Sequence, residues 1–262
     1  MKKVLTIAGS DCSGGAGIQA DIKTITVHGH YAMSVLTALT AQNTMCVSSV
    51  YEVSAQFVAE QLSQVCNDIY PDAVKIGMLY NAEIMKTLSV NIKEYQLNNI
   101  VLDPVMISTS GKSLLKEDAV KTLIEELLPL ADVFTPNIFE ASRISGIKIH
   151  NQADMLDAAQ KISGGYSGYI LIKGGHLEEC CDDLLYKEGE YRWYRQEKIN
   201  NPNTHGTGCT LSSAIACNLA KKQDVKSSIA AAKEYVTGAI KANLNLGQGD
   251  GPLNHAWNLR IK

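Results

Sequence analysis

An excess of positive charge is missing from this chain of 262 residues, which carries 24 Lys and Arg against 27 Asp and Glu, a formal net charge of -3. This balance argues against a broad nucleic-acid-binding surface, which needs clustered basic side chains. Long apolar runs are missing as well. The first one stops before Gly9 and Asp11 and is too short for a signal peptide or a membrane span. We expect neither a nucleic acid nor a membrane as partner.

C-x-x-C pairs are absent among the seven cysteines, and only Cys180 and Cys181 are neighbours. This absence argues against a structural zinc site. An odd number of cysteines in a chain of this length also argues against a secreted disulfide framework. We therefore expect reduced thiols and a cytoplasmic protein.

Repeats, low-complexity tracts and Pro- or Ser-rich linkers are absent, and only 6 prolines occur. The chain is therefore expected to form one domain over residues 1–262. Short apolar runs rich in β-branched residues predict strands covered on both faces, as in a parallel sheet. These runs are residues 4–8, 74–79, 100–105, 133–136 and 169–172.

Segments with helical periodicity alternate with these runs. The predicted helices cover residues 54–69, with Ser54 as N-cap, then 113–128, 210–220 and 224–241, with Asp224 as N-cap. Alternating strands and helices predict an α/β fold with a doubly wound, mostly parallel sheet and helices on both sides. Residues 182–199 break this alternation and predict a small antiparallel hairpin that turns near Gly189.

A glycine-rich segment follows the first predicted strand. Residues 15–20 match the dinucleotide fingerprint G-x-G-x-x-A. A dehydrogenase would need an acidic residue about 20 positions further on, and none occurs between Asp21 and Glu52, so NAD binding is poorly supported. A Walker A loop is absent too, because Met106 stands where its first glycine would be. A tight turn explains the glycines, but so many small residues also leave room for a flat ligand.

The sequence NTHGTGCT, residues 203–210, precedes a smooth apolar helix. Backbone N–H groups at a helix start, with the positive end of the helix dipole behind them, form an anion site. The alternative is an ordinary turn with a Thr N-cap. A buried helix needs partners for its first N–H groups, which favours a bound anion at Gly206, Thr207 and Gly208.

Cys209 lies in the first turn of this helix. The dipole there favours the thiolate and is expected to depress the thiol pKa, so that the sulfur could act as a base toward a substrate hydroxyl. A bound phosphate would oppose a free thiolate, and a loose phosphoryl-transfer transition state does not need early deprotonation. A shared proton is therefore the expectation. The alternative is a small core residue.

Polar residues end three of the predicted strands: Asp103, Asn137 with Glu140, and Lys173. The carboxylates of Asp103 and Glu140 suit Mg²⁺, which proteins hold through one or two carboxylates together with phosphates and water. The alternative is local, with Asn137 capping a helix and Glu140 completing a capping box. Together with a phosphate site, these residues point to metal–nucleotide chemistry.

The chain resembles the hydroxymethylpyrimidine/phosphomethylpyrimidine kinases of thiamine biosynthesis, within the ribokinase-like superfamily. The resemblance runs from residue 4 to about residue 252, on motifs in the order GSDCSGGAGIQADIKT, ALTAQNT, KIGML, LDPVM, TPNIFEA, KGGH and NTHGTGCT. It implies a three-layer α/β/α ribokinase-like fold, usually a homodimer. It also implies that ATP with Mg²⁺ phosphorylates the hydroxymethyl group of the pyrimidine and then the monophosphate.

The resemblance also implies roles for single residues. The position that reads the aminopyrimidine edge matches Gln42, and the rest of the substrate pocket matches Asp21, Met78 and Val105. The anion hole and catalytic position match Gly206, Thr207, Gly208 and Cys209. Positions near the nucleotide match Asn137, Lys173, Asp183, Gly208 and Lys241, and those near Mg²⁺ match Glu140 and Asp103.

Two other functions remain open from the sequence. A pyridoxal kinase of the same subgroup shares many of these motifs, but it typically lacks the glutamine of AQNT and carries a longer, cysteine-bearing flap where this chain has residues 107–115. A non-catalytic protein that binds the vitamin precursor would lose the metal and anion positions, and none is missing here.

Overall fold

The sheet at the centre of the molecule has nine strands among the residues that the computed structural model describes, which are 1–107, 117–175, 177 and 181–259. Its order is β3-β2-β1-β4-β5-β6-β7-β8-β9. The six central strands, β2-β1-β4-β5-β6-β7, pair in parallel with their neighbours in this order. The strand β3 at one edge, and β8 and β9 at the other, pair antiparallel. The strands are β1 (Lys3–Asp11), β2 (Tyr31–Gln42), β3 (Val47–Glu52), β4 (Ala73–Ile76), β5 (Ile100–Leu102), β6 (Val133–Phe134), β7 (Tyr169–Ile172), β8 (Asp183–Lys187) and β9 (Glu190–Tyr194).

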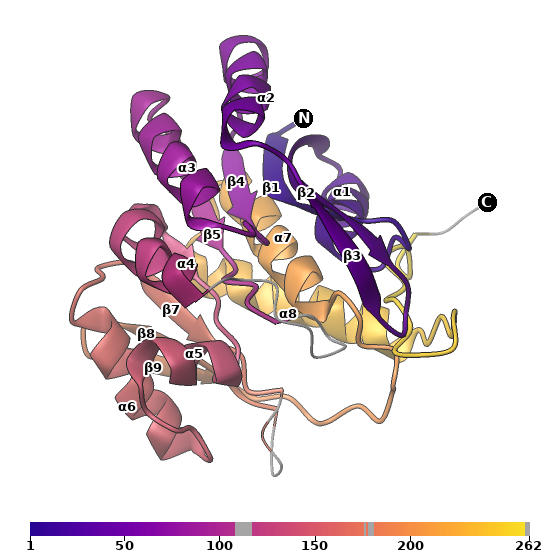
Figure 1. The fold of residues 1–262 in the computed structure, drawn as a ribbon. Helices are drawn as coiled ribbons and strands as arrows, with labels where there is room; N and C mark the ends of the chain where they lie inside the picture. Colours follow the sequence, from indigo (N-terminus) through magenta and orange to yellow (C-terminus); the bar gives the residue numbers. More distant parts are fainter. Residues whose placement is uncertain (108–116, 176, 178–180, 260–262) are drawn as a thin grey trace.

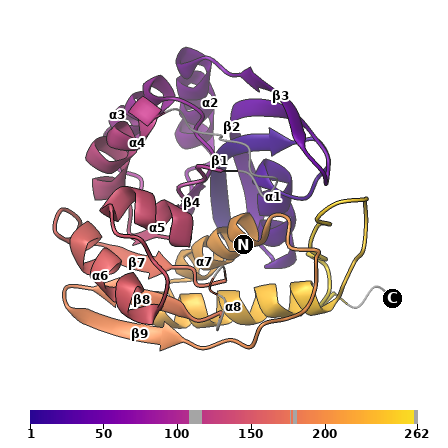
Figure 2. The same cartoon turned by 60° about the horizontal axis from the view of Figure 1, so that its bottom comes forward.

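Helices cover both faces of this sheet (Figure 1). One buried apolar cluster joins the sheet to α2 (Ala55–Asp68), α3 (Ala82–Glu94), α4 (Glu117–Thr122), α5 (Ile138–Ser145) and α6 (Gln152–Ser163). A second cluster joins the opposite face to α1 (Gly17–Val27), α7 (Thr207–Ala220) and α8 (Val225–Lys241). Figure 2 shows α7 and α8 side by side, with α1 next to α7. The expected three-layer α/β/α ribokinase-like architecture is confirmed.

Most predicted elements are confirmed at nearly the expected bounds. Ser54 and Asp224 cap α2 and α8 through side-chain hydrogen bonds. The hairpin of β8 and β9 turns at Gly189, whose φ of 90° favours glycine. Strands β2 and β3 are not among the strands predicted from the sequence. The reason is physical: β3 is an exposed edge strand, and β2 carries half-buried polar residues instead of a continuous apolar run.

The helix predicted at residues 113–128 is shorter and irregular where it is described. After α4 the chain continues as a π-helical turn η1 (Leu123–Leu127) and a 3₁₀ turn η2 (Leu128–Leu130). Pro129 at the start of η2 cannot donate the backbone hydrogen bond that a continued α-helix requires. Residues 108–116, which include most of the flap used to distinguish the two kinases, lie outside the described residues.

The carboxyl ends of the parallel strands lie along one edge of the sheet. Because β1 is flanked by β2 on one side and β4 on the other, the chain reverses its direction of winding there, and ligands of α/β proteins bind at such switch points. Helix α7 begins at this edge. Among the described residues, no helix combines the length and the apolar character that crossing a bilayer needs.

Candidate active site

Gly206 shapes the turn that leads into α7. It is the N-cap residue, its φ is 82°, and a Cβ at this position would lie 1.9 Å from the carbonyl oxygen of Gly15. The turn therefore docks directly onto the first glycine-rich loop, and only glycine fits there. The alternative of a Thr N-cap is wrong, because Gly206 is the N-cap residue and the hydroxyl of Thr207 donates to the carbonyl of Thr204.

The start of α7 carries backbone donors that have no protein acceptor. In the part of the chain that the structure describes, the N–H groups of Gly208 and Cys209 donate to no protein atom. Both residues are half-buried. A Cβ on Gly208 would lie 3.3 Å from Lys173 Nζ and 3.5 Å from Asp103 Oδ2. Backbone donors, the positive end of the helix dipole and an ammonium group thus lie close together, which is the composition of an anion site.

Asp103 and Lys173 follow β5 and β7 and form an ion pair of 2.7 Å. Asp103 is buried, and its carboxylate also accepts a hydrogen bond from Thr135 Oγ1 at 3.3 Å. Burial opposes the charge of Lys173, but the attraction of Asp103 and Glu140 outweighs it and raises the Lys173 pKa. Lys173 is therefore charged at neutral pH, beside the free amides of α7.

Asn137 and Glu140 form the capping box of α5, so the local interpretation of these two residues is confirmed. Glu140 also belongs to the site, because its carboxylate accepts hydrogen bonds from the N–H groups of Asn137 at 2.8 Å and Met106 at 3.3 Å. Burial raises the pKa of Glu140 to about 7; Lys173 opposes this shift and Asp103 reinforces it. Two carboxylates thus share one lysine at the edge of the sheet.

Glu140→Gln is expected to change how stability depends on pH. The ordinary pKa of Glu140 is 4.5 and the folded one about 7, so the folded state holds the proton more tightly and loses stability as pH rises through this window. Gln keeps the acceptor oxygen but cannot ionise. Between pH 4.5 and about pH 7, the free energy of unfolding of Glu140→Gln should therefore rise relative to that of the wild type by on the order of 2–3 kcal/mol. Urea unfolding without metal measures this; a difference independent of pH would contradict it.

The residues expected to hold Mg²⁺ fit that ion in chemistry. Asp103 and Glu140 supply hard oxygen atoms, and a bound cation would favour the ionised form of Glu140, whose pKa burial raises. The described residues contain no group of three or more His, Cys, Asp or Glu side chains that would form a cage of their own. Mg²⁺ held by only two carboxylates keeps ligand positions for phosphates and water.

Asp183 and Lys241 are placed differently. Asp183, at the start of β8, accepts the N–H of Gly174 at 2.9 Å and pairs with Lys233 of α8 at 2.5 Å. It thereby fixes the loop that follows Lys173. Lys241 is exposed at the end of α8, and within the described residues it forms no ion pair. Lys233 is not among the residues predicted from the sequence, because it belongs to no motif.

Cys209 does not behave as its position in the first turn suggests. Burial raises its thiol pKa to about 11; Asp21 and Asp103 add to this shift, whereas Lys75 and the N–H of Gly17 oppose it. The expectation that the helix dipole depresses this pKa is wrong. The thiol holds its proton at neutral pH.

Behind α7 lies a completely buried ion pair that the sequence analysis also missed. Lys75 Nζ lies 2.8 Å from Asp21 Oδ2, and neither side chain has any exposed surface. Asp21 also accepts hydrogen bonds from Thr6 at 2.6 Å and from Ser213 of α7 at 2.7 Å. Asp21 therefore ties α1, β1, β4 and α7 together, beneath the surface that a substrate could touch. A lone lysine inside the apolar strand AVKI was the available signal.

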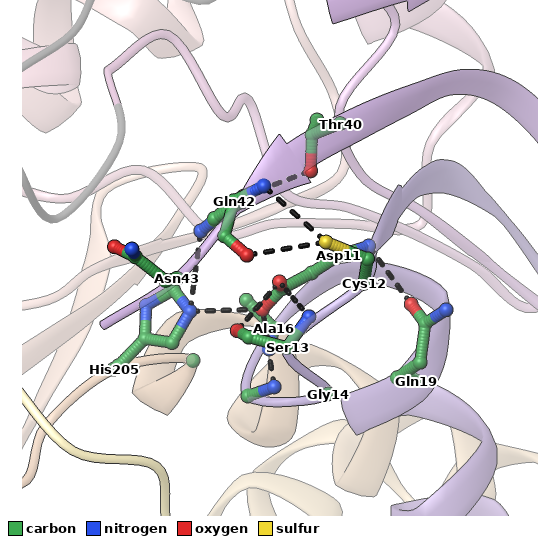
Figure 3. A network of polar contacts seen from close by, with 12 residues as sticks. Asp11, Cys12, Ser13, Gly14, Ala16, Gln19, Thr40, Gln42, Asn43 and His205 are labelled. Carbon is green, nitrogen blue, oxygen red and sulfur yellow. Dashed lines mark hydrogen bonds and ion pairs between the residues drawn. The ribbon is translucent and has the colours of Figure 1, made fainter. Parts of the chain in front are cut away.

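The remaining pocket residues lie around the end of β2. Met78 and Val105 pack with Ala38 in a small apolar cluster apart from the two main cores, and a Cβ on Gly9 would lie 2.9 Å from Met78 Sδ. Gln42 is half-buried at the end of β2. Its backbone N–H donates to Cys12 Sγ, and its side chain contacts His205 and Thr40 (Figure 3). This side of the site thus combines an apolar floor with one amide.

Comparison with known proteins adds relatives of the whole chain. A family model described as phosphomethylpyrimidine kinase matches residues 11–254. The hydroxymethylpyrimidine/phosphomethylpyrimidine kinase of Streptomyces coelicolor is 45% identical over 256 residues, 98% of this chain and 95% of that protein. The thiamine biosynthesis bifunctional protein of Geobacter sulfurreducens is 46% identical over 253 residues, and the match covers 96% of this chain but only 52% of that relative. The ADP complex of Bacillus subtilis pyridoxal kinase has a TM-score of 0.90 at 41% identity and covers 98% of both chains.

Proposed function

We propose a substrate, a phosphoryl donor and residue roles for this chain, which belongs to the phosphomethylpyrimidine kinase family and is a phosphotransferase of thiamine biosynthesis. The substrate is the hydroxymethyl group of 4-amino-5-hydroxymethyl-2-methylpyrimidine, and then the phosphate group of the resulting monophosphate. The phosphoryl donor is ATP, and the ADP complex of the related Bacillus subtilis pyridoxal kinase supports this choice.

One observation carries the proposal: the N–H groups of Gly208 and Cys209 have no acceptor among the described residues, and a Cβ on Gly208 would lie 3.3 Å from Lys173 Nζ. Phosphoryl transfer needs preorganised donors where charge spreads over the moving phosphoryl oxygens. The α7 amides and the Lys173 ammonium supply these donors. Mg²⁺, held near Asp103 and Glu140, would neutralise charge on the nucleotide phosphates. Asn137 and Asp183 position the loops that flank the nucleotide, and Lys241 would approach it from the end of α8.

The acceptor substrate is proposed to lie on Met78 and Val105 with its amino edge against Gln42. A flat ring suits this apolar floor, and the amide offers a donor and an acceptor side by side. Asp21 is proposed to support the pocket without touching the substrate, because it holds Lys75 through an ion pair and α7 through the hydrogen bond from Ser213. Cys209 is proposed to accept the proton of the substrate hydroxyl in the small fraction of molecules whose thiol is ionised, and this fraction grows as the pH approaches the thiol pKa of about 11.

A substrate panel tests the function. The protein is incubated with ATP, Mg²⁺ and, in turn, hydroxymethylpyrimidine, its monophosphate, pyridoxal and pyridoxine, and the products are resolved by mass. We expect the pyrimidine to be converted to its monophosphate and then its diphosphate with release of ADP. Slower conversion of pyridoxal is also expected, given the similarity to the Bacillus subtilis pyridoxal kinase. Phosphorylation of pyridoxal alone would contradict the proposal.

The proposal includes the assembly and location of the protein. We propose a homodimer of one-domain chains, 1–262, that meet at the β2–β3 edge, where Leu39 and Tyr51 are exposed. Exposed apolar side chains on an edge strand favour a contact with another surface. A cytoplasmic location fits the use of ATP and the reduced thiols of the six described cysteines. Sedimentation at micromolar concentration distinguishes a dimer from a monomer.

A further inference from the structure

His205 connects the two halves of the site, although no part of the proposed function uses it. It directly precedes the N-cap Gly206, and its side chain is buried, with only 5% of its surface exposed. Its Nε2 atom lies 2.9 Å from Asp11 Oδ2 and 3.2 Å from the side-chain nitrogen of Gln42 (Figure 3). One imidazole nitrogen therefore faces a carboxylate of the first loop and the amide that is proposed to read the substrate.

The proton on this nitrogen is determined by Asp11. Burial opposes the charge of Asp11, but hydrogen bonds from His205, Ser13 and Ala16 lower its pKa to about 2. The carboxylate is therefore ionised and can only accept hydrogen bonds. A bare Nε2 would place a lone pair against this carboxylate at 2.9 Å in a buried site. Nε2 must therefore carry a proton and donate it.

Thr40 determines the other end of the Gln42 amide. Thr40 Oγ1 lies 2.9 Å from the carbonyl oxygen of Ser10 and 3.1 Å from Gln42 Oε1. The hydroxyl has one proton and the carbonyl can only accept it, so Thr40 Oγ1 is left as an acceptor toward Gln42. Gln42 then meets an acceptor at Thr40, and at His205 a protonated nitrogen that has no lone pair for the Gln42 NH₂ group. The NH₂ group therefore finds an acceptor only after the amide is turned over from the orientation in which Oε1 faces Thr40. The two amide orientations are isosteric, and in the second one NH₂ donates to Thr40 while Oε1 shares the Nε2–H group of His205 with Asp11.

We propose that His205 is a positioning residue for substrate specificity: its Nε2–H group, held by Asp11, fixes the orientation in which Gln42 presents its amide to the pyrimidine. This inference rests on the proposed role of Gln42. The amide keeps one N–H and one oxygen lone pair for the ligand, and their order is set by His205 and Thr40. A ring whose donor and acceptor stand in the matching order binds, and one without the amino group leaves a polar group of Gln42 unpaired.

The protonation state of His205 is the direct test. Imidazole ¹⁵N NMR of the protein, with the His205 resonances identified by their loss in His205→Gln, reports which nitrogens carry protons. We expect a proton on Nε2 across the neutral range. A neutral imidazole that carries its proton only on Nδ1 would overturn the inference.

Variants test the effect on specificity. His205→Leu removes the donor and should raise the KM for hydroxymethylpyrimidine about ten- to a hundredfold, the loss expected for an unpaired buried polar group. The KM for ATP should change less than about threefold by the same reasoning, because the nucleotide does not touch Gln42. His205→Gln brings an amide N–H to nearly the same point and should restore most of the affinity. If the Gln variant is as impaired as the Leu variant, His205 is only structural and the inference fails.

Gln42→Met separates this inference from the proposed function on which it rests. Each variant is assayed with hydroxymethylpyrimidine and with its analogue that lacks the amino group. If Gln42→Met leaves the preference between the two unchanged, the proposed role of Gln42 fails. If Gln42→Met abolishes the preference but His205→Leu does not, only the role of His205 fails. Loss of the preference in both variants, and its return in His205→Gln, supports the inference.

Discussion

Gly208→Asp is expected to lower turnover by at least 10²–10³-fold, the effect of losing one preorganised donor in a charge-stabilising site. The new Cβ would lie 3.3 Å from Lys173 Nζ and 3.5 Å from Asp103 Oδ2. Its carboxylate would then pair with Lys173 and occupy the space in front of the free α7 amides. A negative charge there repels the phosphoryl group at the moment when its own charge must be stabilised. Steady-state kinetics with ATP and hydroxymethylpyrimidine measure the loss.

Gly208→Asn is the matched control, since it has nearly the same bulk without the charge. We expect it to retain more activity than Gly208→Asp, because its amide can still donate to an anion. Melting temperatures of both variants separate loss of the fold from loss of the site. Turnover of Gly208→Asp close to that of the wild type would show that the start of α7 does not bind the transferred phosphoryl group.

Cys209→Ala should lower kcat by roughly 10²–10⁴-fold, the usual contribution of a general base, with little change in the KM for the pyrimidine. The reason is that the proposed role of Cys209 concerns the proton of the hydroxyl and not the ring. Burial raises the Cys209 pKa to about 11, so the thiolate fraction grows about tenfold per pH unit below that value. The activity of the wild type should therefore rise between pH 8 and 9.5, above the pH at which Glu140 ionises.

The alanine variant should lose this rise with pH, which a purely structural role of the thiol would not predict. Cys217, one of the buried cysteines of the same helix, provides the control. Cys217→Ala should leave both kcat and the pH profile nearly unchanged, apart from a loss of stability. A Cys209→Ala enzyme with the activity and pH profile of the wild type would show that the thiol takes no part in the reaction.

The fold could be predicted from the sequence wherever apolar periodicity is strong. The parallel strands and the caps Ser54 and Asp224 follow from local patterns, and the structure confirms them. Strands β2 and β3 could not be predicted in this way, because one lies at an edge and the other carries polar residues that face the site. Their identity as strands depends on pairing with β1, which is a tertiary effect.

The site was predictable as a set of loops but not as a set of contacts. The ends of the parallel strands indicate Asp103, Asn137 and Lys173, and the structure places them along one edge with α7. The pKa of Cys209 could not be predicted, since it depends on burial and on Asp21 and Asp103, which are distant in sequence. For the same reason, no local motif reveals that Lys75 is buried against Asp21.

A crystal structure of the protein with Mg²⁺, hydroxymethylpyrimidine and a non-hydrolysable ATP analogue tests the central claim most directly. We predict that oxygens of the terminal phosphate accept hydrogen bonds from the N–H groups of Gly208 and Cys209, with Lys173 beside them. Terminal phosphate bound elsewhere on the protein, with those two N–H groups facing water or a neighbouring side chain, would contradict the proposed site.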